Sequence, residues 1–132
     1  MTTDNLWGKL PEEDHTESPN AILEAQGYIL EAATSGRLRG RLRRAVVDEQ
    51  IVIDFSVVAP QVNNFQVTLI RAIHGAIMYP VRVYDLLGDP NGAAVICDDS
   101  KLLKSYLANI LQSPEVKRVI SSLLGQSPPL TI

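Results

Sequence analysis

The stretch RLRGRLRRAVVDEQIVIDFSVVAPQVNNFQVTLIRAIH, residues 37–74, decides the fold of this chain. Polar and apolar residues alternate through most of it, and a period of two is typical of β-strands with one buried face. Segment 47–50 (VDEQ) and the pair Asn63-Asn64 interrupt the alternation with residue types that favour turns. The pattern therefore predicts consecutive antiparallel strands joined by short turns.

Two segments of this region leave an alternative open. Apolar residues in segments 37–47 and 65–77 also recur at helical spacing, so both segments are compatible with helices. Gly36 and Gly40 disfavour a helix in the first segment. The second segment is rich in residues that favour strands. We therefore favour strands in both, with segments 51–58 and 65–74 at the centre of the sheet.

A helix is predicted on the N-terminal side of the strands. Ser18 supplies a capping hydroxyl, and Pro19 suits the first helical position. Apolar residues then repeat at roughly helical spacing as far as Ala33, and Gly36 is a natural stop.

Two more strands and two helices are predicted on the C-terminal side. Segment 79–86 (YPVRVYDL) alternates, and segment 93–97 is a short apolar run that follows a strong turn. Two runs with apolar residues at helical spacing follow, and Ser113-Pro114 begins the second. This order predicts an α+β fold: an N-terminal helix, an antiparallel sheet of about four or five strands, and two C-terminal helices packed on one sheet face.

The length of 132 residues is that of a single domain. We expect an acidic tail at 1–17, one domain at 18–125 and a short C-terminal tail at 126–132. The single cysteine, the polar N-terminus and the absence of a long apolar run predict a cytoplasmic protein without a membrane partner.

The net charge of −3 is unevenly distributed along the chain. Residues 1–31 carry seven acidic residues and one lysine, whereas residues 32–132 carry eight acidic and eleven basic residues. A basic surface is therefore compatible with the low isoelectric point. The sequence also allows the acidic tail to lie across such a surface and mask it.

Arginines concentrate in one segment, since five of the eight lie between residues 37 and 44. On a strand, those at odd positions would share one face at intervals of about 6.6 Å, which resembles the spacing of successive phosphates. Arginine binds phosphate through two parallel hydrogen bonds. The candidate polyanion-binding residues are Arg37, Arg39, Arg41, Arg43 and Arg44. The competing interpretations are a solvated face paired with acids, or an edge strand protected by charge from aggregation, and we favour these.

The tail carries three large apolar residues, Leu6, Trp7 and Leu10, among acidic ones. Aromatic anchors dominate the energetics of many interfaces. These residues are therefore candidates for docking, either on a partner or on the chain's own domain.

Few residues are candidates for catalysis. His74 is a candidate base or metal ligand, but no histidine or cysteine lies at ligand spacing from it. Cys97 precedes a helix start, although the aspartates that follow oppose a thiolate. Asp85, Asp99 and Lys101 fit a short nuclease pattern, in which carboxylates would hold Mg²⁺ beside a lysine. We expect no catalytic residue, metal site or cofactor.

The sequence thus favours a non-catalytic interaction module that binds a protein partner or itself, of a regulatory, adaptor, antitoxin-like or immunity-like kind. The second hypothesis is a nucleic-acid or polyanion binder that uses the arginines of segment 37–44. The third is a hydrolase or nuclease that uses His74, or Asp85, Asp99 and Lys101.

Overall fold

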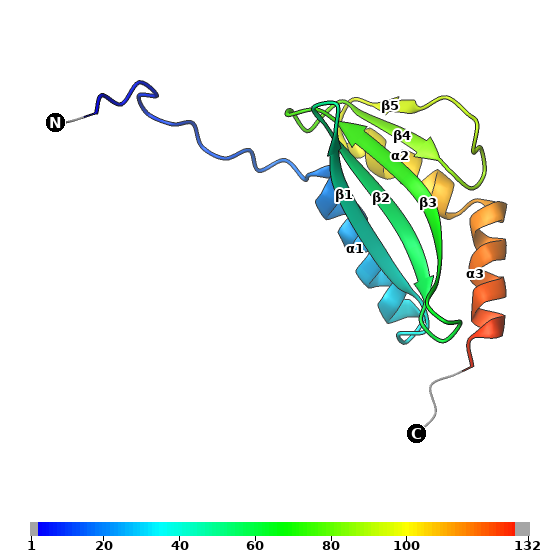
Figure 1. Cartoon of the computed structure of the whole chain (residues 1–132). Coiled ribbons are helices and arrows are strands. Elements are labelled where there is room, and N and C mark those ends of the chain that lie inside the picture. Colours follow the sequence, from blue (N-terminus) through cyan, green and yellow to red (C-terminus); the bar gives the residue numbers. More distant parts are fainter. Residues whose placement is uncertain (1–2, 129–132) are drawn as a thin grey trace.

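A computed structural model describes residues 3–128 of the chain (Figure 1). Both segments that were compatible with helices form strands, which confirms the favoured interpretation. The strands are β1 (Arg39–Val47), β2 (Gln50–Ala59), β3 (Phe65–His74), β4 (Val81–Asp85) and β5 (Val95–Cys97). The helices are α1 (Pro19–Ala33), α2 (Ser100–Leu111) and α3 (Pro114–Gln126). The α+β fold with an antiparallel sheet is therefore confirmed, with five strands.

The strands pair in chain order, β1-β2-β3-β4-β5, because short turns connect neighbours. Val47 pairs with Gln50, so Asp48 and Glu49 alone make the first turn. Both have positive φ angles, 50° and 64°, which match the twist of the flanking strands. Asn63 and Asn64, in the second turn, also have positive φ angles, as their residue type allows.

The last two strands are shorter than their sequence pattern. Pairing of β4 begins at Val81, opposite Cys97, because Pro80 has no N–H to donate to a ladder. The strand β5 starts at Val95 rather than residue 93. The two strands form only three residue pairs, the fewest of any neighbouring strands in the sheet.

Capping residues fix the helix starts where the sequence placed them. The hydroxyl of Ser18 accepts a hydrogen bond from the N–H of Ala21 at 3.0 Å and caps α1. Asp99 caps α2 in the same way through the N–H of Leu102 at 2.8 Å. Ser113 caps α3 through the N–H of Val116 at 3.3 Å.

All three helices contribute to a core on one face of the sheet, which we call the covered face. Helix α1 runs behind β1, α2 lies behind the upper part of the sheet, and α3 runs beside β3 (Figure 1). Helix α1 and β1 meet at Gly27 and Gly40, where a Cβ on Gly40 would overlap the backbone of Gly27. Within residues 3–128, no helix or strand lies over the other face, which we call the open face.

The helices and strands leave both ends of the described chain without regular structure. Residues 3–17 contain no helix or strand. At the other end, α3 includes Gln126, so the expected C-terminal tail begins at Ser127 at the earliest. Residues 1–2 and 129–132 of the two expected tails lie outside the described part of the chain.

Candidate interaction surface

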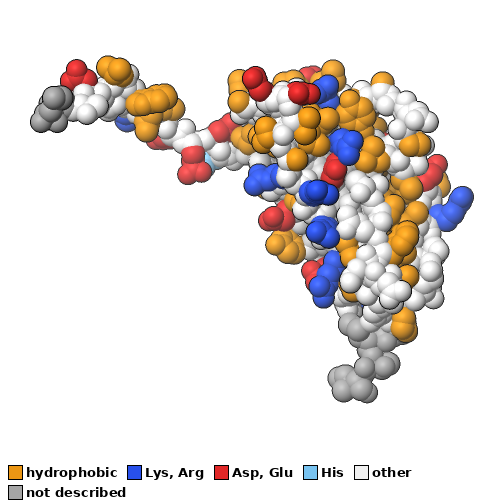
Figure 2. Space-filling model, viewed as in Figure 1, with side chains coloured by type: hydrophobic (Ala, Val, Ile, Leu, Met, Phe, Trp, Pro, Cys, Tyr) orange, Lys and Arg blue, Asp and Glu red, His pale blue; other side chains and the backbone are white. Residues whose placement is uncertain are grey.

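Three of the five candidate arginines form a row along β1 on the open face. Arg39, Arg41 and Arg43, which we call the arginine row, are all exposed. They stand opposite Val58, Ser56 and Asp54 of β2. Figure 2 shows basic side chains spaced along the β1 side of this face. Strand alternation therefore places the row as expected, on the face that the helices leave open.

Carboxylates neutralise part of this charge. The Nε and Nη2 atoms of Arg71 donate to the two carboxylate oxygens of Asp54, at 2.8 and 3.2 Å. This hydrogen-bonded pair raises the pKa of Arg71. Asp54 on β2 stands opposite Arg43, but its ion-pair partner comes from β3. Arg39 pairs with Glu31 of α1 at 3.4 Å.

The middle and end of the row keep their charge. Arg41 donates to the amide oxygen of Gln66 at 3.3 Å, a neutral partner. Among residues 3–128, neither Arg41 nor Arg43 forms an ion pair. Two guanidinium groups are therefore available to a negatively charged group that approaches the open face.

The other two candidate arginines do not belong to the row. Arg37 precedes β1, and its guanidinium donates to the carbonyls of Leu124 and Ser127, each at 2.7 Å. It thereby adds charged donors at the end of α3, where the Leu124 carbonyl also accepts from the N–H of Ser127 at 3.2 Å. The sequence carried no local signal for this role. Arg44 alternates to the other side of β1 and stands opposite the buried Ile53.

An apolar row crosses the open face next to the arginines. Ala45 stands opposite Val52, which stands opposite Ile73, and the same row continues through Arg82 to Ile96. We call Ala45, Val52, Ile73 and Ile96 the apolar band. Arg82 interrupts the band, but its guanidinium is held by the side chain of Gln50 at 2.6 Å.

The band leads into a hollow at the end of the sheet where β3 connects to β4. The hollow has a volume of about 540 Å³, and its lining is mostly apolar. Ile73 and Ile96 of the band, together with Ile77 and Tyr79 of the β3–β4 connection, contribute to its walls. Ile77 is 79% exposed and Ile96 is 61% exposed. Figure 2 shows hydrophobic side chains gathered at this end of the molecule.

A second apolar groove lies between α1 and α3, with a volume of about 230 Å³. Its floor is Phe55, Val57 and Leu69 of the sheet, and Ile29 and Ile120 line its sides. Ile29 is 58% exposed, close to the value for Ile96. The molecule therefore has two partly apolar surfaces on opposite sides. The arginine row borders the one on the open face, whereas the described residues that line the groove between α1 and α3 are uncharged.

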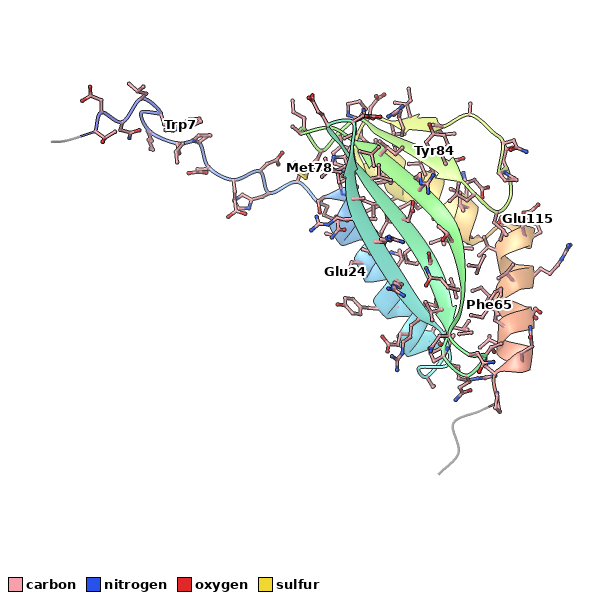
Figure 3. The ribbon with its side chains drawn as sticks, viewed as in Figure 1. Trp7, Glu24, Phe65, Met78, Tyr84 and Glu115 are labelled. Atoms are coloured by element: carbon pink, nitrogen blue, oxygen red, sulfur yellow. The ribbon has the colours of Figure 1, made fainter. Side chains whose placement is uncertain are left out.

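The three apolar residues of the tail lie away from the domain. Leu6, Trp7 and Leu10 are 92%, 82% and 65% exposed. Figure 3 shows Trp7 far out on the tail. The Asn5 side chain makes a turn here, because it accepts from the N–H of Trp7 and donates to the carbonyl of Gly8. The acidic part of the tail does not lie across the arginine row (Figure 1).

The tail joins the domain at Glu17. The hydroxyl of Tyr79 donates to the Glu17 carbonyl at 2.8 Å, and the Glu17 carboxylate pairs with Lys104 of α2. The tail therefore leaves the domain at the same end of the sheet as the hollow.

Cys97 lies on the covered face, and His74, which also alternates to that side of β3, contributes to the wall of the hollow. His74 is buried, and its Nδ1 lies 2.8 Å from the carbonyl oxygen of the next residue, Gly75. Cys97 is buried, and burial, followed by the charges of Asp98 and Asp99, raises the pKa of its thiol. The thiol is therefore protonated at neutral pH and is poorly suited to nucleophilic attack.

The three residues of the nuclease pattern are occupied by local structure. The Asp85 carboxylate accepts from the N–H of Gly88 at 2.9 Å, in a turn. Asp99 caps α2, and Lys101 is exposed on its first turn. In the described part of the chain, no three His, Cys, Asp or Glu side chains gather as metal ligands would.

Comparisons with protein-family models, with curated protein sequences and with solved structures find no match to this chain. Among residues 3–128, no helix is long and apolar enough to cross a bilayer. The surface itself is therefore the basis for a functional proposal.

Proposed function

We propose that this chain is a non-catalytic interaction module that binds a protein partner or a second copy through the open face of its sheet. One observation carries the proposal: the apolar band and its hollow lie beside an arginine row, and no element of the described chain covers them. The solvent-facing side of an antiparallel sheet is normally polar. Exposed apolar surface with a polar border is typical of interaction sites.

The charge pattern supports a protein partner over a nucleic acid. Glu31 and Asp54 each bind one arginine of this surface, which reduces its attraction for phosphates. Interfaces between proteins combine an apolar centre with a polar, charged border. The apolar band and the arginine row have that arrangement.

A polyanion ligand is the second candidate, because Arg41 and Arg43 are exposed without a carboxylate partner in the described chain. Such binding would weaken steeply with salt, whereas docking on the apolar band would weaken less. We place the protein in a reducing compartment such as the cytoplasm, since its one cysteine is a buried free thiol.

The experiment is photo-crosslinking in the cells that make this protein, with the reactive amino acid at position 96. Position 29 is the matched control, because Ile29 and Ile96 have similar exposure and lie on opposite sides of the molecule. We expect protein adducts from position 96 and fewer from position 29. Nucleic-acid adducts at position 96 would favour the second candidate. Absence of any adduct at position 96 would reject an open-face interaction.

A further inference from the structure

We infer that the open face binds the N-terminal tail of a second copy of this chain, with Trp7 in the hollow and the tail acids along the arginine row. The inference rests on the proposed function and names its partner. The tail has two parts, a turn that displays Leu6 and Trp7 and an acidic run with Glu12, Glu13 and Asp14. The open face also has two parts, one apolar and one basic.

The spacing of the two parts of the tail matches the spacing of the two parts of the open face. Extended chain and β-strand both advance about 3.3 Å per residue. When Leu10 lies over Ala45 and Val52, a tail running antiparallel to β1 brings Glu12 beside Arg43, two residues along the strand. Asp14 then lies beside Arg41, two residues further along.

The other end of the tail fits as well. Trp7 lies three residues from Leu10 in the opposite direction, at most about 10 Å away, because the chain turns at Gly8. That distance carries it to the level of Val47 and its partner Gln50, which lines the near edge of the hollow. Pro11 favours an extended conformation at Leu10, which limits the entropy lost when the tail docks.

The geometry favours a second copy over the chain's own domain. The tail is fixed at Glu17, at the end of the sheet that carries the hollow. A tail that folded onto its own open face would bring its acids to the apolar end first and Trp7 to the arginines last. In that order the tail acids would face the apolar surface and Trp7 would face the arginines, so neither part of the tail would meet a matching surface. A tail from another molecule can run in the opposite direction along the open face. Only such a tail places Trp7 at the hollow and its acids at the arginine row.

Trp7 is the only tryptophan, and its fluorescence therefore reports this docking directly. In the full-length chain, we expect the emission to move to shorter wavelength as protein concentration rises. The mass measured by sedimentation equilibrium should rise over the same range. A shift that is independent of concentration would mean docking within one chain and would overturn the inference.

Charge reversal tests the register. The Arg41→Glu/Arg43→Glu variant should raise the midpoint concentration of the shift about tenfold or more, because like charges then face one another. The Glu12→Lys/Asp14→Lys variant should do the same, and the two variants mixed should recover the shift, since each then offers a matching surface to the other. Failure of the mixture to recover would overturn the proposed pairing.

A second mixture separates donor from acceptor. Trp7→Phe makes a chain with an intact open face and no tryptophan signal, and Ile96→Glu makes a chain with an intact tail and a disrupted face. Ile96→Glu alone should show no shift, and addition of the Trp7→Phe chain should restore it. Ile29→Glu is the matched control and should behave as wild type. If Ile29→Glu abolishes the shift instead, the tail binds the groove between α1 and α3, and the inference is wrong. If no shift occurs at any concentration while position 96 still crosslinks to another protein, the tail inference fails and the proposed function stands.

Discussion

Val52 and Ile53 are neighbours in β2 and lie on opposite faces of the sheet. Ile53 is fully buried beneath the helices, whereas Val52 is half-buried on the open face. Both are β-branched apolar residues, yet only one contributes to a closed core. The covered face therefore stabilises the fold, and the apolar residues of the open face are available for another purpose. The expected outcomes below test this division.

The largest difference should come from truncating these two neighbours. Ile53→Ala removes fully buried methyl groups and leaves a cavity, so it should lower the free energy of unfolding by about 2–5 kcal/mol. Val52→Ala should lower it by less than about 1 kcal/mol, because that side chain is already partly exposed to water. Urea denaturation of both variants measures the difference. Equal losses would contradict the division between the two faces.

The close approach of α1 to β1 gives the next effect. A Cβ at Gly40 would overlap the Gly27 backbone, so Gly40→Ala must push α1 away from the sheet. We expect a loss of about 1–3 kcal/mol in the free energy of unfolding. Gly75→Ala is the control, since a Cβ there meets nothing within 4 Å. Thermal unfolding followed by circular dichroism should distinguish the two, and a wild-type midpoint for Gly40→Ala would be incompatible with the contact.

The arginines also differ in their expected contribution to stability, according to whether they contact the rest of the fold or lie on the open face. Arg37→Met leaves the carbonyls of Leu124 and Ser127 without their charged donor and should destabilise the fold by about 1–3 kcal/mol. Arg43→Met on the open face should change stability by no more than about 0.5 kcal/mol. Urea denaturation measures both, and hydrogen exchange at the end of α3 should rise in Arg37→Met alone. A larger loss of stability in Arg43→Met than in Arg37→Met would contradict this assignment of a structural role to Arg37.

The turn between β1 and β2 offers a stabilising change. Glu49 adopts a φ of 64°, a conformation that glycine reaches without steric penalty. Glu49→Gly should raise the free energy of unfolding by about 0.5–1 kcal/mol. The steric strain that glycine relieves in the native turn is larger than the cost of the extra conformational entropy that glycine loses on folding. A destabilised Glu49→Gly would exclude strain at this turn.

The smallest effect concerns Cys97, whose pKa is raised on the covered face. In the unfolded chain this thiol loses its proton near pH 8.5. The native thiol keeps its proton to higher pH, so its contribution to stability is complete below about pH 8.5 and is lost as pH rises through the native pKa. Stability of the wild type should therefore fall more steeply above that pH than stability of Cys97→Ala. Parallel curves would contradict a buried, protonated thiol.

Much of the fold could be predicted from local signals. Alternation in segments 37–47 and 50–59 reflects one buried and one open face, and the helix caps follow from side chains that bond nearby N–H groups. The arginine row was predictable for the same reason, since alternation alone places Arg39, Arg41 and Arg43 together.

The remaining features depend on register and on distant contacts. The apolar band combines residues from β1, β2, β3 and β5, and no single segment shows that they are adjacent. Arg37 has its partners 87 and 90 residues away, so its role in capping α3 had no signal in its own segment. The chain reverses at Ser35 and Gly36, both with positive φ, and β1 therefore starts after Arg37 rather than at it.

The order of the strands bears on how the chain folds during synthesis. Each strand pairs with the one made just before it, so the β1-β2-β3 meander forms from contacts of low sequence separation. Low contact order favours rapid folding. The meander is complete once His74 has emerged from the ribosome, whereas the Arg37 contacts require Leu124 and Ser127. Helix α1 precedes the meander and can cover the β1 side of the nascent sheet at once, whereas the part that α2 and α3 cover stays exposed until residues 100–126 have been made.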